Sequence, residues 1–172
     1  MSIKNFVSLS MASAALLLPM AAIASDGPHF VAPGAEAIFE GVGVVNGNIC
    51  DVVATVRVGP SGHSSGPHEG HAEKAFVTFE NSGPPPCDEF ETHAVLRPNG
   101  DIKSIELFQL PNRITPVCAA TSISGGAVYT TNLSGQITAA ASNGVLSVGP
   151  CFLATSLTFV STDTPGSIAI VP

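Results

Sequence analysis

Apolar and polar residues alternate along much of the chain, as they do in β-strands that bury one face. No segment sustains an amphipathic helical period with capping residues at both ends. Fourteen prolines and seventeen glycines separate the apolar segments, at intervals typical of short strands and turns. The alternation is clearest between Ile49 and Val58, where one face would carry Val52, Ala54, Val56 and Val58 and the other Val53, Thr55 and Arg57.

Three Asn-Gly dipeptides mark the expected hairpin turns, because both residues tolerate the positive φ that such turns require. Asn46-Gly47 would join residues 37–45 to 49–58, Asn99-Gly100 would join 90–97 to 102–108, and Asn143-Gly144 would join 136–141 to 145–148. Further strands are expected at 75–80, 127–131, 152–160 and 167–171. The pattern predicts an all-β fold, an antiparallel sandwich or barrel-like domain of about ten short strands.

The first residues are typical of a cleavable signal peptide. Lys4 is followed by an uncharged apolar stretch that Pro19 interrupts, and the stretch ends in Ala22-Ile23-Ala24, whose small residues suit signal peptidase. Residues 1–24 are therefore predicted to be removed, which leaves 25–172 as a single secreted β domain with no transmembrane span. Its expected location is extracellular or at the cell surface, with the periplasm as the alternative.

Charge and hydropathy narrow the range of partners. The chain has a formal net charge of -7, only 11% charged residues and a mean hydropathy of +0.39. Nucleic acid and anionic lipid are poor partners for such a chain. So few charges favour self-association through unprotected strand edges. The segment Ser167 to Val171, which carries no charge, is either the last strand of its own sheet or a strand that pairs with a neighbouring chain.

Four cysteines in an exported chain favour disulfides over metal ligands. Gly83-Pro84-Pro85-Pro86-Cys87 recurs loosely as Gly149-Pro150-Cys151, and each of these cysteines follows another at a similar distance. This echo suggests two related β units. Of the three pairings that four cysteines allow, it favours Cys50 with Cys87 and Cys118 with Cys151.

A loop rich in histidine is the main candidate metal site. His63, His68 and His71 lie close to Glu69 and Glu73, and imidazoles with carboxylates are good ligands for zinc or copper. Glycines and a proline in the loop raise the entropic cost of ordering it around a metal. A solvated polar loop is the favoured interpretation, and a weak zinc or copper site at the three histidines is the alternative.

Two further patterns are candidate sites. Ser64 stands in a G-x-S-x-G sequence, but no helix follows to form the strained elbow that a hydrolase nucleophile needs. Asp88, Glu89 and Glu91 form an acidic patch without regular calcium-loop spacing, so a solvated turn is the favoured interpretation there. The sequence therefore predicts no catalytic residues and no cofactor.

Several of these features together resemble a known family. They are the signal, the phenylalanine strand before Asn46-Gly47, the cysteine strand Ile49 to Val58, Cys87 after a proline, Leu110-Pro111, and the Cys118 to Cys151 unit. In this layout, which covers most of the predicted mature chain, the sequence resembles the alkane-oxidation protein activators, a group of small exported bacterial proteins. The resemblance implies a secreted, non-enzymatic protein associated with the cell surface or biofilm matrix and with growth on hydrocarbons.

The leading functional hypothesis is thus a secreted structural or surface-interaction protein. The first alternative is a binding module for an apolar ligand such as a hydrocarbon, or a metal-binding secreted protein. An exported hydrolase that uses Ser64 is the remaining alternative.

Overall fold

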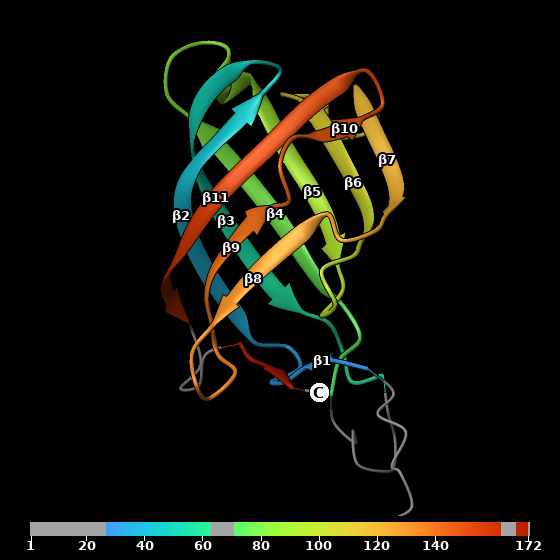
Figure 1. Ribbon diagram of the computed structural model, residues 1–172. Helices are drawn as coiled ribbons and strands as arrows, with labels where there is room; N and C mark the ends of the chain where they lie inside the picture. Colours follow the sequence, from blue (N-terminus) through green and yellow to red (C-terminus); the bar gives the residue numbers. More distant parts are fainter. Residues whose placement is uncertain (1–26, 63–70, 163–167, 172) are drawn as a thin grey trace, which may run out of the picture.

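The computed structural model describes residues 27–62, 71–162 and 168–171, which form strands joined by turns (Figure 1). The predicted signal segment, residues 1–24, lies outside the described residues. In chain order the elements are β1 (His29–Phe30), β2 (Glu36–Val45), β3 (Asn48–Val58), β4 (Ala75–Ser82), the 3₁₀ helix η1 (Cys87–Glu89), β5 (Phe90–Leu96), β6 (Ile102–Gln109), β7 (Cys118–Ile123), β8 (Ala127–Thr131), β9 (Ile137–Ser142), β10 (Leu146–Val148), β11 (Cys151–Thr162) and β12 (Ile170–Val171).

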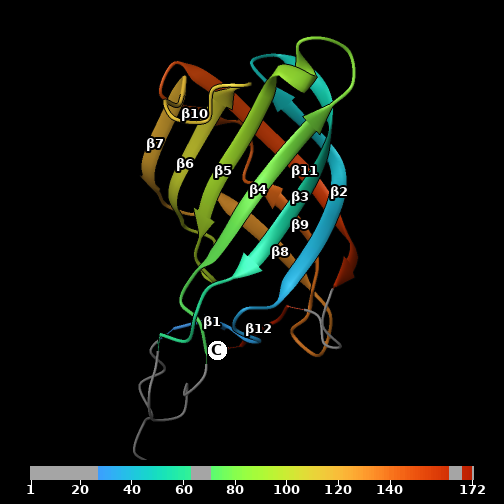
Figure 2. The ribbon, with the colours of Figure 1, turned by 180° about the vertical axis from the view of Figure 1, so that it is seen from behind.

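One antiparallel sheet of ten strands makes up most of the fold. Its order is β7-β6-β5-β4-β3-β2-β11-β9-β8, and β10 pairs with β11 beside this path. The sheet curls on itself so that β8 and β9 lie across from β3 and β4, as the two opposite views show (Figures 1 and 2). The all-β prediction is confirmed, and of its two forms the protein adopts the barrel-like one, as a half-barrel.

Alternation along the strands explains which side of the sheet is buried. On β3, Val52, Ala54 and Val58 are 2%, 0% and 1% exposed, whereas Val53 on the other face is 36% exposed. The backbones of β2 and β11 approach each other closely, since a side chain on Gly41 would collide with the carbonyl oxygen of Ser156. A register shift in β11 lies close by, and such bulges increase the local twist of a strand.

Two of the three predicted Asn-Gly hairpins are confirmed. Asn46-Gly47 joins β2 to β3, with Val45 opposite Asn48. Asn99 and Gly100 lie in the turn between β5 and β6, which pair antiparallel. Asn46, Gly47 and Gly100 have φ values of 50°, 86° and 87°, the left-handed backbone for which these residues were expected.

The third predicted hairpin, at Asn143-Gly144, is wrong. β9 and β10 do not pair with each other, since both pair with the same edge of β11, with Ala141 opposite Ser156 and Leu146 opposite Leu153. The dipeptide therefore lies in a wide bulge, where residues 142–145 face 154 and 155 of β11. The competing interaction is the long β11, which comes later in the chain and offers a continuous edge to both segments.

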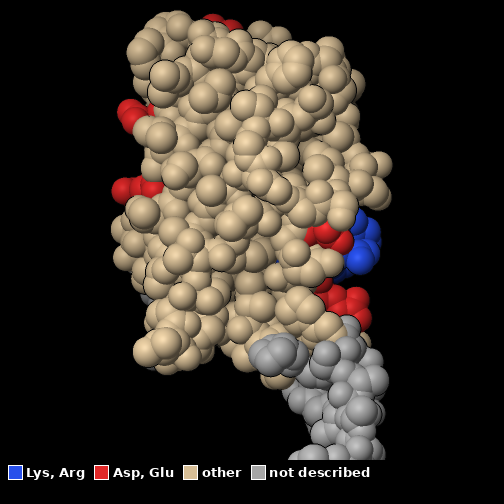
Figure 3. Space-filling model, in the orientation of Figure 1, with Lys and Arg blue, Asp and Glu red and all other residues tan. Residues whose placement is uncertain are grey.

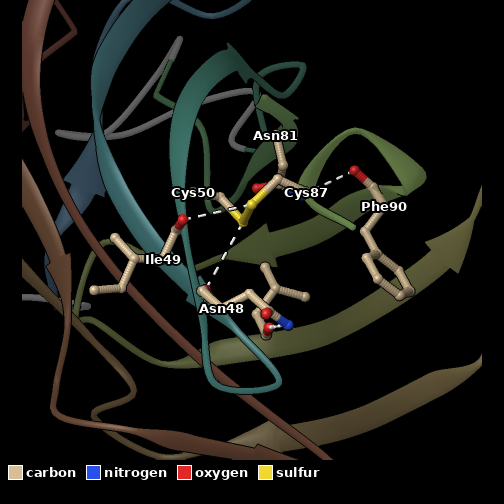
Figure 4. Close-up of a disulfide and its surroundings, with 7 residues drawn as sticks. Asn48, Ile49, Cys50, Asn81, Cys87 and Phe90 are labelled. Carbon is tan, nitrogen blue, oxygen red and sulfur yellow. Dashed lines mark hydrogen bonds between the residues drawn. A yellow bond between two sulfur atoms is a disulfide. The ribbon is translucent and has the colours of Figure 1, made fainter. Parts of the chain in front are cut away.

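Two disulfides join Cys50 to Cys87 and Cys118 to Cys151, the pairing that the spacing favoured. The first ties β3 to η1, and the Asn81 amide donates a hydrogen bond to Phe90 O at 2.9 Å beside it (Figure 4). The second ties the edge strand β7 to the start of β11. The two cysteine units thus take different places, since Cys50 lies on a central strand and Cys118 on an edge strand.

The buried side chains form two clusters inside the curl. One contains Phe30, Phe39, Val52, Leu157 and Ile168, with Phe159 packed edge-on against Phe39 at 5.7 Å between ring centroids. The other surrounds the two disulfides and includes all four cysteines with Leu107 and Val148.

Both ends of the described chain close one end of the half-barrel. β1 pairs antiparallel with β12, and these strands lie together at the lower end in Figures 1 and 2. Phe30 and Ile168 are each 1% exposed there. Of the two interpretations of the C-terminal segment, the structure shows the one in which the segment pairs within its own chain, with Ile168 in the core. Ser167 lies outside the described residues.

Removing the Cys118–Cys151 bridge should destabilise the protein by about 3 to 4 kcal/mol, from loop-closure entropy. The double variant Cys118→Ala/Cys151→Ala can be measured by urea unfolding. Amide exchange should also accelerate in β7, which has only β6 as a ladder partner. The matched variant Cys50→Ala/Cys87→Ala should lose similar stability, yet β3 should stay protected because strands flank it on both sides. Equal exchange in β7 for both variants would contradict this role of the second bridge.

Truncation of the buried Ile168 should cost about 2 to 5 kcal/mol, the usual range for a core Ile→Ala change. The Ile168→Ala variant can be compared by thermal unfolding with Leu133→Ala, which alters a side chain that is fully exposed in the β8–β9 turn. The control should unfold within about 0.5 kcal/mol of the unmodified protein. An Ile168→Ala variant as stable as the control would show that the C-terminal segment does not close the core.

Candidate functional site

A cavity of about 80 Å³ lies inside the curled sheet and touches both core clusters. Its walls are apolar side chains that point inward from strands on all sides of the curl, among them Phe39, Ala54, Val77, Ile105, Ala140 and Leu157. A void of this kind, lined by apolar groups, tends to stay dry and to accept apolar ligands.

Small residues at inward positions create this space. Ala54, Ala75 and Ala94 are 0%, 0% and 4% exposed, so each occupies a core position that most strands give to a larger side chain. On β9, Ala140 faces Leu157 of β11 and Tyr129 of β8. The small side chain of Ala140 leaves this part of the interior unfilled.

Three polar side chains at the cavity wall, those of Asn81, Tyr129 and Ser142, form hydrogen bonds within the protein itself. Tyr129 donates its hydroxyl hydrogen to Arg97 O at 3.0 Å. Burial, followed by the nearby charge of Asp101, raises the pKa of the Tyr129 phenol well above its usual range. Asn81 donates to Phe90 O, and Ser142 Oγ accepts from Thr155 N–H at 3.0 Å. These hydrogen bonds leave mainly hydrocarbon facing the cavity.

A polar network beside the cavity holds the β7–β8 connection against the β5–β6 turn. Asp101 accepts hydrogen bonds from Gly125 N–H at 2.8 Å, Ser124 Oγ at 3.2 Å and Asn99 Nδ2 at 2.9 Å. Asn143 adds a bond from its amide to Gly125 O at 3.0 Å. The Gly125 N–H, with Asn99 and Ser124, lowers the pKa of the Asp101 carboxyl below its ordinary 3.8.

Comparison of the chain with models of protein families, with curated proteins and with solved structures gives no significant match.

The structure describes only part of the predicted histidine site. His63, His68 and Glu69, together with Ser64 of the hydrolase pattern, lie outside the described residues. His71 lies beside His29, with ring centroids 6.2 Å apart. Within the described ranges, no group of three or more His, Cys, Asp or Glu side chains is arranged to hold a metal ion.

The acidic patch after Cys87 divides between a helix and a strand. Asp88 and Glu89 lie in η1, whereas Glu91 on β5 is only 4% exposed. Glu91 accepts from Arg113 at 2.6 Å and pairs with His93 Nε2 at 2.7 Å. Glu91 therefore anchors the loop that contains Arg113, a role that the sequence did not reveal because Glu91 and Arg113 are 22 residues apart along the chain.

Two features of the described residues concern the cellular location of the protein. No helix among the described residues has the length and apolar character to cross a membrane. Two disulfides are compatible with a protein that works outside the cytoplasm.

Asp101 should make stability depend on acid pH. Because its folded-state pKa is depressed, the stabilisation is present above about 3.8 and is lost as pH falls through the folded-state pKa. The Asp101→Asn variant should be less stable than the unmodified protein at neutral pH, and the difference should shrink at pH ~2.5. Asp51→Asn, which removes an exposed carboxylate from β3, should leave the urea midpoint nearly unchanged at both pH values. A difference for Asp101→Asn that persists in acid would argue against the carboxylate's role.

Proposed function

We propose that this protein is exported and contacts apolar material outside the cytoplasm without catalysing a reaction. The observation that most supports this proposal is the apolar cavity inside the half-barrel, which would accept the end of an alkyl chain. The signal-like segment 1–24 and the two disulfides support export. The resemblance to alkane-oxidation protein activators supports a hydrocarbon as the ligand class and the cell surface or biofilm matrix as the setting.

The size of the cavity limits what it can hold. Its volume of about 80 Å³ is roughly half that of an engineered cavity of ~150 Å³ that binds benzene. A sterol or a whole fatty acid would not fit, whereas the last three or four carbons of an unbranched chain would. The remainder of such a ligand would lie outside the cavity.

The same volume limits the affinity. Each buried CH₂ contributes about 0.8 kcal/mol, so a segment of three or four carbons gives about 3 kcal/mol. A dissociation constant of about 1 mM already requires about 4 kcal/mol. The cavity would therefore bind weakly and would fill where apolar material is concentrated, as at a droplet or a coated surface, which favours a surface-interaction protein over a carrier of trace ligands.

The outer surface supports contact with an uncharged partner. From Ile114 to Thr162 the chain contains no Asp, Glu, Lys, Arg or His. In the view of Figure 3, which faces β8, β9 and β11, charged residues lie only at the margins. Val145 and Phe152 are 66% and 55% exposed on this part of the chain, and exposed apolar side chains that gather in this way mark interaction surfaces.

Filling the cavity should abolish alkyl binding. Ala140→Leu adds three carbons from the cavity wall, whereas Ala139→Leu adds them on the outer face of the same strand. In buffer that contains about 100 mM 1-butanol, far above a dissociation constant of about 1 mM, methyl resonances of Ala54, Val77 and Ile105 should shift in the unmodified protein and in Ala139→Leu, and should stay fixed in Ala140→Leu.

Ala94→Val provides a second filling variant if Ala140→Leu does not fold. Butanol that leaves the inward methyl resonances of the unmodified protein unchanged, or an Ala139→Leu variant that loses the response as well, would refute the cavity as the binding site. Ester hydrolysis by the purified protein that Ser64→Ala removes would instead identify an enzyme.

A further inference from the structure

The sheet has two terminal strands, and they differ in how well their outer edges are covered. The edge of β7 is covered at its start, because Cys118 is bonded to Cys151 and the turn at Gly149 lies against Ala119, with Ala119 O 3.3 Å from the position of a Cβ on Gly149. Ser122 has a φ of 59°, which interrupts the regular strand further along. β7 is thus poorly suited to accept another strand.

The outer edge of β8, in contrast, is better suited to accept another strand. Asn143 N–H donates to Gly126 O, and Asn132 N–H donates to Gln136 O, both at 2.9 Å. These two bonds show which residues of β8 direct their backbone N–H and C=O groups toward β9, because such residues alternate along an antiparallel strand. Backbone groups of Val128 and Thr130 therefore face β9, whereas those of Tyr129 and Thr131 face away from it.

Ala127 confirms this alternation of backbone groups along β8, because its N–H points away from β9 and donates to Gly100 O at 2.8 Å. Among the residues that the structure describes, the N–H groups of Tyr129 and Thr131 have no backbone or side-chain acceptor. Two donors, with the carbonyl groups beside them, are left on one edge of a regular strand.

Charge makes this edge suitable for a second copy of the chain. Soluble proteins usually protect an edge strand with lysine, proline or an inward-pointing charge, and β8 reads Ala-Val-Tyr-Thr-Thr. The chain as a whole has a net charge of -7, so two copies repel each other, and the charge-free surface from Ile114 to Thr162 is where they approach with the least repulsion. Val128 is 50% exposed beside the edge, which adds apolar area to such a contact.

We propose that two copies of this chain pair antiparallel along β8, about a two-fold axis that passes beside Thr130. In this register Tyr129 of one copy and Thr131 of the other exchange both N–H···O hydrogen bonds, and the symmetric pair repeats the exchange. The two half-barrel sheets then continue into each other through β8. The pairing uses backbone groups on the edge and outward side chains, so it is independent of the ligand proposed for the cavity.

Thr130→Lys tests the proposed axis directly. In the pair, residue 130 of each copy lies opposite its equivalent in a non-hydrogen-bonded position, where the Cα atoms are about 4.5 Å apart. Two lysines there repel each other, while the Thr130 backbone continues to pair with β9. Ser156→Lys is the matched control, because it adds the same charge to the same outer face on β11, which is paired on both sides.

The chain is expressed in full, purified and studied by light scattering over a concentration series. The unmodified protein and Ser156→Lys should rise from the mass of one copy to that of two, and Thr130→Lys should remain at the mass of one. Amide exchange at Tyr129 and Thr131 should slow with concentration in the first two proteins only. An unmodified protein that stays at the mass of one copy, a mass that grows beyond two, or a Ser156→Lys variant that also fails to pair would overturn the proposal.

Discussion

The Cys118–Cys151 disulfide joins two parts of the sheet that backbone hydrogen bonds leave separate. β7 ends the sheet on one side, and β11 lies six strands away along the ladder order. By linking them, the bridge holds the curl closed where β10 and the turn at Gly149 come against β7. The cluster of Leu107, Val148 and the cysteines forms around this closure, and Leu146 and Leu153 of the same cluster line the cavity.

The same closure explains how the fold tolerates an unfilled interior. A void of about 80 Å³ costs about 2 kcal/mol at the usual ~24 cal/mol per Å³. Each disulfide contributes about 3 to 4 kcal/mol in return. Two bridges therefore outweigh the cost of the small side chains at Ala54, Ala94 and Ala140. A cytoplasmic protein without bridges would need larger residues at these positions to reach a similar stability.

Local signals in the sequence predict the regular part of this fold well. The Asn-Gly turns and the alternation between Ile49 and Val58 identify β2, β3, β5 and β6, and the spacing of the cysteines identifies both bridges. They fail at Asn143-Gly144, because the turn chemistry there is correct for a hairpin and only the later strand β11 decides which edge the two segments join.

The candidate site depends almost entirely on long-range placement. The cavity is bounded by inward residues of nearly every strand, so no single segment of the sequence predicts it. The pairing of Glu91 with Arg113 joins a strand to a loop across the β5–β6 hairpin, and neither residue has a local motif. The burial of Ile168 requires β1, which is only two residues long and carries too little pattern to be recognised beforehand.

β8 and β9 show how one short sequence meets two requirements at once. Because side chains alternate, Tyr129 and Ala140 determine the shape of the interior, while Val128, Thr130 and Ala139 determine the outer surface. Neither β8 nor β9 carries a charged side chain, so these strands offer no electrostatic attraction with which to select a partner. Selection must then come from volume inside and from backbone hydrogen-bond register outside. The volume of the cavity discriminates weakly between alkyl chains of different length but strongly against branched or ring-shaped ligands. The hydrogen-bond register fixes the relative position of two paired strands to within one residue, because a slip of one residue moves every inward side chain outward.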